Sequence, residues 1–270
     1  MKPNVFSRRD AASRQPIRML RRSILLPSLV MALLVTTGCN RTASVDLSPL
    51  ADMARSGAME ITKRVNQSHA FLASDVLPHP EVEAAFTGIA PPEGATVPWQ
   101  TTPYIAAAVF GADGEVKQVL PRASDAFADM LKEAAGAEPP VGDLVIVPNT
   151  TAFTLGMHVE RPAGGRLAAL LDVDRVILDG VLVPLARGAH GVAFLANHEG
   201  RILLSIHPSL AAVPLERLGL RLPEPGKAVT GQAEIAGEPH YVGLARGGAP
   251  NGWIVGVATP TTSAVEPAKE

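Results

Sequence analysis

Side chains that could carry out catalysis are few and scattered in this sequence. There is one cysteine, Cys39, and no Gly-x-Ser-x-Gly string, so neither common hydrolase nucleophile stands in its usual setting. The pair Gly164-Gly165 lacks the lysine and the spacing of a phosphate-binding loop. A zinc site needs about four converging ligands, and no two histidines stand at helical ligand spacing; they are His69, His79, His158, His190, His198, His207 and His240. We therefore predict no enzyme activity, no metal and no cofactor.

The segment before Cys39 has the composition of an export signal. The first 23 residues carry six arginines and one acidic residue, Asp10, and residues 24–35 form an apolar run. A basic stretch before a short apolar one is typical of a secretory signal. Residues 24–37 number about 14 and include Pro27, whereas a membrane-spanning helix needs about 20. We expect residues 1–38 to be a signal peptide and not a membrane span.

The apolar run ends in Val35-Thr-Thr-Gly-Cys39, which resembles the lipobox of bacterial lipoproteins. The resemblance implies that Cys39 receives a diacylglycerol, with fatty acyl chains such as palmitate, and anchors the mature protein to a membrane in the periplasm. Each buried methylene contributes about 0.8 kcal/mol to such an anchor. Thr36 departs from the leucine usual at its position, so cleavage without lipid is the alternative. The sequence leaves the export route and the membrane that carries the anchor open.

Composition excludes one class of partner and permits a large core. The formal net charge is −2, with both signs interspersed, whereas a nucleic-acid partner requires a basic face. Hydrophobic residues make up 47% of the chain and aromatic residues only 4%, so the interior must be aliphatic. We expect no nucleic-acid partner.

After a polar tether at residues 39–46, apolar residues recur mostly three or four apart, which predicts a long helix with one apolar stripe. The stripe consists of Leu50, Met53, Gly57, Ile61, Val65, Leu72 and Val76. Pro78 and Pro80 are expected to end this helix, because proline lacks the amide donor. The proline-rich stretch 90–103 is then a loop.

The rest of the chain repeats one order of elements. The apolar run 105–110, the turn Asp113-Gly114 and the run 115–120 predict a β-hairpin. Residues 191–206 repeat this pattern with the turn Glu199-Gly200, starting 86 residues later. A helical or irregular segment follows each hairpin, at 123–135 and 210–222. Three strand-like runs close each copy: 143–147, 152–159 and 166–171 in the first, and 227–235, 239–245 and 253–258 in the second.

This duplication predicts an α+β fold, with a long N-terminal helix at 47–80 and two lobes that each contain an antiparallel sheet. The first lobe covers 81–173 and the second 174–260. The apolar segment 174–186 is predicted to be a helix that joins the lobes, with Pro184 ending or kinking it. The polar tail 261–270 is predicted to be disordered.

The order of elements resembles the double Cache domains, PAS-like sensors that bacteria place outside the membrane. Three strings carry the resemblance: residues 191–208, a Phe-Leu hairpin that runs to His207-Pro208; residues 165–174, a strand that ends in an aspartate; and residues 252–260, a closing strand. The resemblance spans residues 47–260. It implies that the first lobe is membrane-distal and holds a small ligand such as an amino acid, amine or carboxylate.

The resemblance also points to individual ligand contacts. Asp172 matches the strand-end aspartate that pairs with a ligand ammonium in the amino-acid-binding subset, and Arg122 is a remnant of that subset's arginine. Trp99 and Tyr104 precede the first strand and could wall a pocket, although core packing is an equal alternative. Asp172 and Asp174 could instead cap the first turn of the next helix.

We expect a lipid-anchored sensory or ligand-binding protein that recognises a small polar metabolite. The family usually adds membrane helices and a cytoplasmic output domain, and this chain ends at its second lobe, so we expect a separate membrane-bound signalling partner. A homodimer formed through the 47–76 helix is a further hypothesis. The alternative from another class is an envelope adaptor or structural lipoprotein that uses the lobes for protein docking, and a transporter-associated binding lipoprotein is a third candidate.

Overall fold

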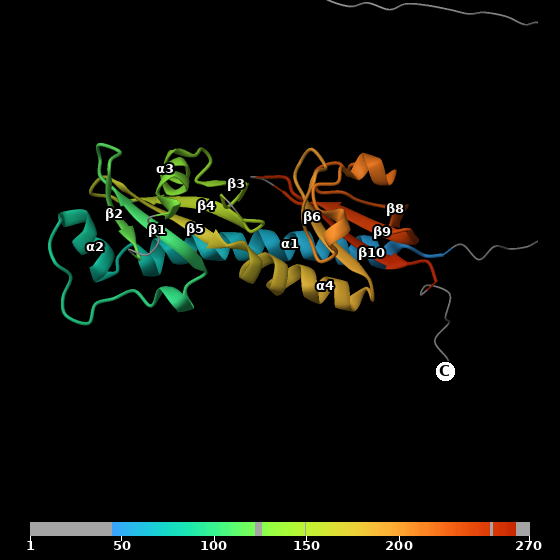
Figure 1. Ribbon diagram of the computed structural model, residues 1–270, viewed down its shortest axis with the longest axis horizontal. Coiled ribbons are helices and arrows are strands. Elements are labelled where there is room, and N and C mark those ends of the chain that lie inside the picture. The colour runs from blue at the N-terminus through green and yellow to red at the C-terminus, as the bar shows by residue number, and fades with distance from the viewer. Residues whose placement is uncertain (1–44, 122–125, 149, 249–250, 263–270) are drawn as a thin grey trace, which may run out of the picture. The chain divides into compact units, whose positions relative to one another are not determined.

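The computed structural model describes residues 45–121, 126–148, 150–248 and 251–262. Cys39 and Arg122, two residues of the predicted sites, lie outside these ranges. The described residues form two five-stranded antiparallel sheets and a set of helices (Figure 1). Within the same ranges, no helix is both long enough and apolar enough to cross a membrane.

Helix α1 (Ser48–Phe71) buries the part of the predicted stripe that lies on it, except Met53, which is half-buried. Its apolar side chains share one core with residues of both sheets, among them Leu171 and Val255. α1 therefore contacts both lobes, as Figure 1 shows. Its buried residues are Leu50, Ala54, Gly57, Ala58, Ile61, Val65 and Ser68.

The end of α1 differs from the prediction in one respect. The helix continues through a π-helical turn, η1 (Leu72–Val76), and stops before Pro78 as expected. Pro80, however, begins a second helix, α2 (Pro80–Thr87), and does not end the first. Proline suits the first helical position because the amide it lacks has no partner there. The His79 side chain caps α2 by accepting from the Glu81 amide at 3.3 Å.

The first lobe is a sheet with a helix on each face. Its strands are ordered β2-β1-β5-β4-β3, and α1 packs on one face while α3 (Ala128–Gly136) packs on the other. Alternate residues of β5 face opposite sides, so Leu171 packs toward α1 and Leu170 toward α3. The strands are β1 (Tyr104–Phe110), β2 (Val116–Leu120), β3 (Val141–Ile146), β4 (Phe153–Glu160) and β5 (Arg166–Asp172).

The second lobe repeats this sheet, which confirms the predicted α+β duplication. Its strands follow the equivalent order, β7-β6-β10-β9-β8, and every pairing is antiparallel. Short 3-10 turns, Pro208–Leu210 and Leu215–Leu218, take the place of α3. The strands are β6 (Val192–Ala196), β7 (Ile202–Ser205), β8 (Ala228–Ile235), β9 (Glu238–Arg246) and β10 (Ile254–Pro260).

A continuous helical connection joins the lobes, as the sequence predicts. It consists of the π-helical segment η4 (Asp174–Leu182) and helix α4 (Val183–Gly188). Pro184 lies in the first turn of α4, where the winding changes from π to α. Proline donates no amide hydrogen bond, so the backbone ladder is interrupted at this residue.

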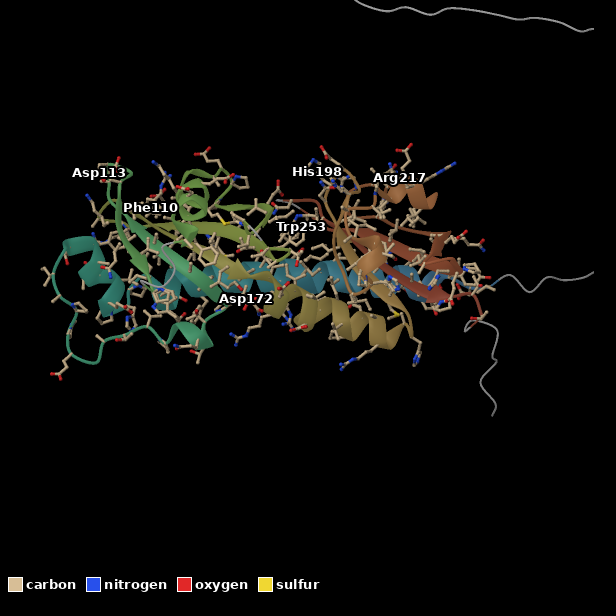
Figure 2. The ribbon with its side chains drawn as sticks, in the orientation of Figure 1. Phe110, Asp113, Asp172, His198, Arg217 and Trp253 are labelled. Atoms are coloured by element: carbon tan, nitrogen blue, oxygen red, sulfur yellow. The ribbon has the colours of Figure 1, made fainter. Side chains whose placement is uncertain are left out.

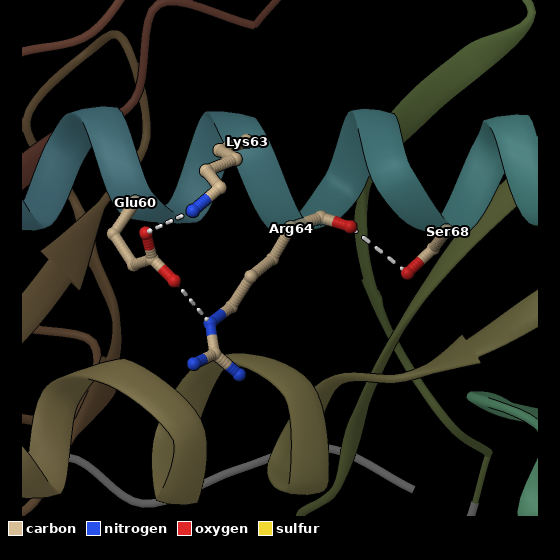
Figure 3. A network of polar contacts seen from close by, with 4 residues as sticks. All are labelled: Glu60, Lys63, Arg64 and Ser68. Carbon is tan, nitrogen blue, oxygen red and sulfur yellow. Dashed lines mark hydrogen bonds and ion pairs between the residues drawn. The ribbon is translucent and has the colours of Figure 1, made fainter.

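A polar network on α1 fixes its contact with this connection (Figure 3). Glu60 accepts from Arg64 Nε at 2.9 Å and pairs with Lys63 Nζ at 3.6 Å, and Ser68 Oγ donates to the Arg64 carbonyl at 2.9 Å. A Cβ added to Gly180 of η4 would lie 2.7 Å from Arg64 Nη1. The glycine therefore leaves the space that the guanidinium occupies between the two helices.

Candidate functional site

A groove of about 700 Å³ lies between α3, the edge strand β3 and the second lobe. Its floor includes Gly156 of β4 and Leu170 of β5, on the face of the first sheet that α3 covers. α3, the chain that follows it and β3 contribute Met130, Glu133, Ala134, Gly136, Ala137, Glu138, Pro139, Val141, Gly142, Asp143 and Val145. The second lobe contributes His198, Arg246, Asn251 and Gly252.

Two side chains hold the C-terminal end of α3 against the sheet. His158, buried on β4, places Nδ1 3.0 Å from the Ala134 carbonyl, and Arg166 Nη1 donates to the Ala135 carbonyl at 2.6 Å. Gly156 permits the close approach, because a Cβ there would lie 2.7 Å from the Ala134 Cβ. This wall of the groove is thus fixed by the sheet beneath it.

The described residues between β9 and β10 form the opposite wall and are tied to the first lobe. Asn251 Nδ2 donates to the Gly142 carbonyl of β3 at 2.6 Å. Within the connection, Arg246 Nε donates to the Gly252 carbonyl at 3.2 Å and the Gly247 amide to the Trp253 carbonyl at 2.8 Å. The groove is therefore formed by both lobes and not by the first alone.

The structure places Trp99 and Tyr104 away from this groove. Both are buried in the core that faces α1, with exposures of 7% and 4%. The Tyr104 hydroxyl donates to the Ser68 carbonyl of α1, and its ring stacks on Phe71 with centroids 6.4 Å apart. Burial raises the pKa of Tyr104. These contacts are those of the core-packing alternative, and a ligand role for the two residues stays a prediction.

Asp172 lies at the end of β5 and is half-buried (Figure 2). Two residues beyond Leu170 on the same strand, it shares the sheet face that forms the groove floor, although it does not line the groove. Its Oδ1 accepts from the Arg175 amide at 3.0 Å, which is the predicted capping contact. Burial, with Asp172 and Asp179 nearby, raises the pKa of Asp174. Ligand contact by Asp172 stays a prediction.

Three other hollows among the described residues, of about 610, 490 and 550 Å³, are each lined by one lobe alone or by the second lobe with α1 or α4, and not by both lobes. On the outer face of the second sheet, Phe194 fills the space that a side chain at Gly256 would occupy. A cavity of about 20 Å³ lies against Trp253 and α1, enough for about one water molecule. Across the described ranges, no group of three or more His, Cys, Asp or Glu side chains is placed to hold a metal ion.

Sequence analysis missed the second-lobe wall of this groove. Arg246 and Asn251 flank the turn before the last strand, and Asn251-Gly252 is a recognisable turn pair. Nothing in the sequence indicates that this turn meets Gly142, which lies 109 residues earlier. A contact of that separation is set by the packing of both lobes on α1.

Comparisons with known proteins identify the fold. No family model and no curated protein sequence matches the chain. The ligand-binding domain of the Pseudomonas aeruginosa PAO1 amino acid chemoreceptor PctB, in complex with L-Arg, aligns with a TM-score of 0.53 at 14% identity, over 82% of this chain and 98% of that one. The fold is that of a chemoreceptor ligand-binding domain.

A second receptor gives the same result. The ligand-binding domain of the Pseudomonas fluorescens chemoreceptor CtaA in complex with L-isoleucine aligns with a TM-score of 0.55 at 16% identity, over 80% of this chain and 93% of that one. Its complex with L-alanine aligns at 0.51 and 18% identity, over 82% and 100%. These alignments confirm the predicted two-lobed, Cache-like architecture.

Proposed function

We propose that this protein is an extracytoplasmic ligand-binding sensor that holds a small polar metabolite in the groove between α3, β3 and the β9–β10 connection. The groove carries the proposal. Its volume of about 700 Å³ falls in the range of roughly 300–1,000 Å³ found for small-molecule sites. The likeness of the fold to chemoreceptor domains supports the same function, since those domains bind amino acids in their structures.

The chemistry of the groove favours binding over catalysis. Its walls hold carboxylates, one arginine and one histidine around a floor of Gly156 and Leu170. His198 is exposed on the β6–β7 turn, where Figure 2 shows it, and no described serine or cysteine lines the groove beside it. A general base without a nucleophile within reach is a poor hydrolytic arrangement. We therefore propose that the protein binds its ligand without transforming it.

The anchor and the partner belong to the same proposal. Lipid at Cys39 would hold the domain at a membrane in the periplasm, and a membrane-bound protein would read the occupied groove. A homodimer formed through α1 would cover Met59, which is 68% exposed on that helix. Mass spectrometry of the membrane-extracted protein tests the anchor: a diacylglyceryl adduct is expected on the wild-type chain and is absent from Cys39→Ser. A wild-type mass without lipid would favour simple cleavage.

A thermal-shift screen against amino acids, amines, short carboxylates and purines tests the ligand-binding function. A ligand that binds only the folded state raises the melting temperature in a saturable way. Ala137→Trp places an indole in the groove at a half-buried residue with extended backbone, and Ala211→Trp adds the same side chain at an exposed residue of the second lobe. We expect the shift to disappear only in Ala137→Trp. No shift with any compound would instead support the envelope adaptor.

A further inference from the structure

The two walls of the groove carry opposite charge. The first-lobe wall carries Glu133, Glu138 and Asp143, and the second-lobe wall carries Arg246. Within the described ranges, the three carboxylates and the Arg246 guanidinium have no ion-pair partner in the protein. Charges of both signs that face a groove without partners are available to a ligand that carries both.

Arg246 is held in place although it lacks a counterion. It ends β9, is half-buried, and its Nε donates to the Gly252 carbonyl at 3.2 Å. A Cβ added to Gly252 would lie 3.4 Å from Nη2, so the guanidinium packs closely over this glycine, whose φ is +57°. Because Nε is the bonded atom, the Nη groups keep donors that fit a carboxylate in a bidentate geometry.

We propose that the second lobe completes the ligand site: Arg246 binds a carboxylate, the acidic wall of the first lobe binds an ammonium, and the ligand is a zwitterion whose charged groups are several carbons apart. This inference rests on the proposed function and assigns a ligand class to the same groove. Arg246 forms no ion pair with these carboxylates, so the ligand and not the protein must bridge the two charged walls, and charges spaced along a flexible chain let it contact both. Such a ligand bridges the lobes directly.

Isothermal titration calorimetry of the purified protein with δ-aminovalerate and ε-aminocaproate tests this assignment. Valerate and pentylamine each carry one of the two charges and serve as comparison ligands. We expect the zwitterions to bind and each single-charge analogue to bind at least about tenfold more weakly, since each leaves one charged wall unpaired.

Variants separate the two walls. Arg246→Gln, and separately Glu133→Gln combined with Glu138→Gln, should each weaken zwitterion binding at least about tenfold. Arg246→Lys keeps the charge and should retain part of the affinity, which distinguishes loss of the carboxylate contact from loss of folding. Arg217→Gln is the matched control: this exposed arginine lies in the 3-10 turn Leu215–Leu218, outside the groove (Figure 2). It should leave binding unchanged.

Equal affinity of the wild-type protein and Arg246→Gln would overturn the inference, and so would single-charge analogues that bind as well as the zwitterions. If neither zwitterion binds while another compound gives a shift that Ala137→Trp abolishes, the bridging ligand is wrong and the proposed function stands. If no compound binds at all, both fail.

Discussion

Because α1 packs closely on the second sheet, we predict that replacing Gly243 destabilises the fold. This glycine lies on β9, and a Cβ there would sit 2.7 Å from the Ala51 amide nitrogen and closer still to the Leu50 carbonyl group. Non-bonded heavy atoms separate to about 3.5 Å or more, so Gly243→Ala must push the first turns of α1 off the sheet by roughly 1 Å. The obstacle is helix backbone, which cannot move aside by changing a rotamer.

The magnitude follows from this clash. Overpacking costs about 1–3 kcal/mol, and a backbone obstacle places the cost near the upper end. Replacing glycine returns about 0.4–1 kcal/mol by restricting the unfolded chain. We expect a net loss of about 2 kcal/mol, which corresponds to a fall in melting temperature of roughly 4–8 °C for a domain of this size.

Circular dichroism melts and urea unfolding provide the assay. Gly231→Ala on the adjacent strand β8 is the matched control, because its Cβ would meet only the end of the flexible Leu220 side chain, at 3.0 Å. The control should change the melting temperature by less than about 2 °C, in keeping with surface substitutions within about 0.5 kcal/mol. A Gly243→Ala protein as stable as the control would show that α1 does not pack on β9 as described.

Three further predictions concern hydrogen bonds and charges. Tyr104→Phe should lower the free energy of unfolding by about 1 kcal/mol, because it removes one of the two hydrogen bonds that the Ser68 carbonyl accepts, the other coming from the Leu72 amide. Because burial raises the pKa of Tyr104, that tyrosine stabilises the fold below its ordinary pKa of 10.0 and loses this contribution as the pH rises further. Melts between neutral and alkaline pH should therefore show a smaller alkaline loss of stability in the variant. Asp172→Ala should lower the free energy of unfolding in urea by about 1 kcal/mol, because the Arg175 amide loses its cap. An unchanged urea midpoint would show that this hydrogen bond does not stabilise the fold. Glu60→Gln should lower the free energy of unfolding by less than about 1 kcal/mol, and by less still in high salt. Since the Arg64 side chain lowers the pKa of Glu60, this stabilisation is present above the ordinary pKa of 4.5 and fades as the pH falls below it. A loss of stability that persists in acid would contradict the ion pair.

The order and type of the elements could be predicted from sequence because each has a local cause. Alternating apolar runs, the turn at Asp113-Gly114 and the three-to-four spacing along α1 act over a few residues, and Gly114 takes the positive φ, +77°, that its turn requires. The misassigned Pro80 has a local cause too, since proline both stops a helix and starts one. Only the cap at His79 distinguishes the two cases.

The site could be predicted only in part, because it depends on which helix covers which face. Tyr104 and Asp172 lie on neighbouring strands, yet strand alternation points Tyr104 toward α1, whereas Asp172 shares the α3 face with Leu170. Sequence analysis treated both as contacts for one pocket. The contact between Asn251 and Gly142 requires both lobes to be in place, and no local sequence pattern predicts it.

Hydrogen–deuterium exchange with the compound that gives the largest thermal shift tests the central claim most directly. If the groove is the ligand site, saturating ligand should slow exchange in the peptides that carry α3, β3 and the described residues of the β9–β10 connection, and leave β7 and β8 unchanged. Protection confined to the second sheet, or protection that survives in Ala137→Trp, would contradict the account.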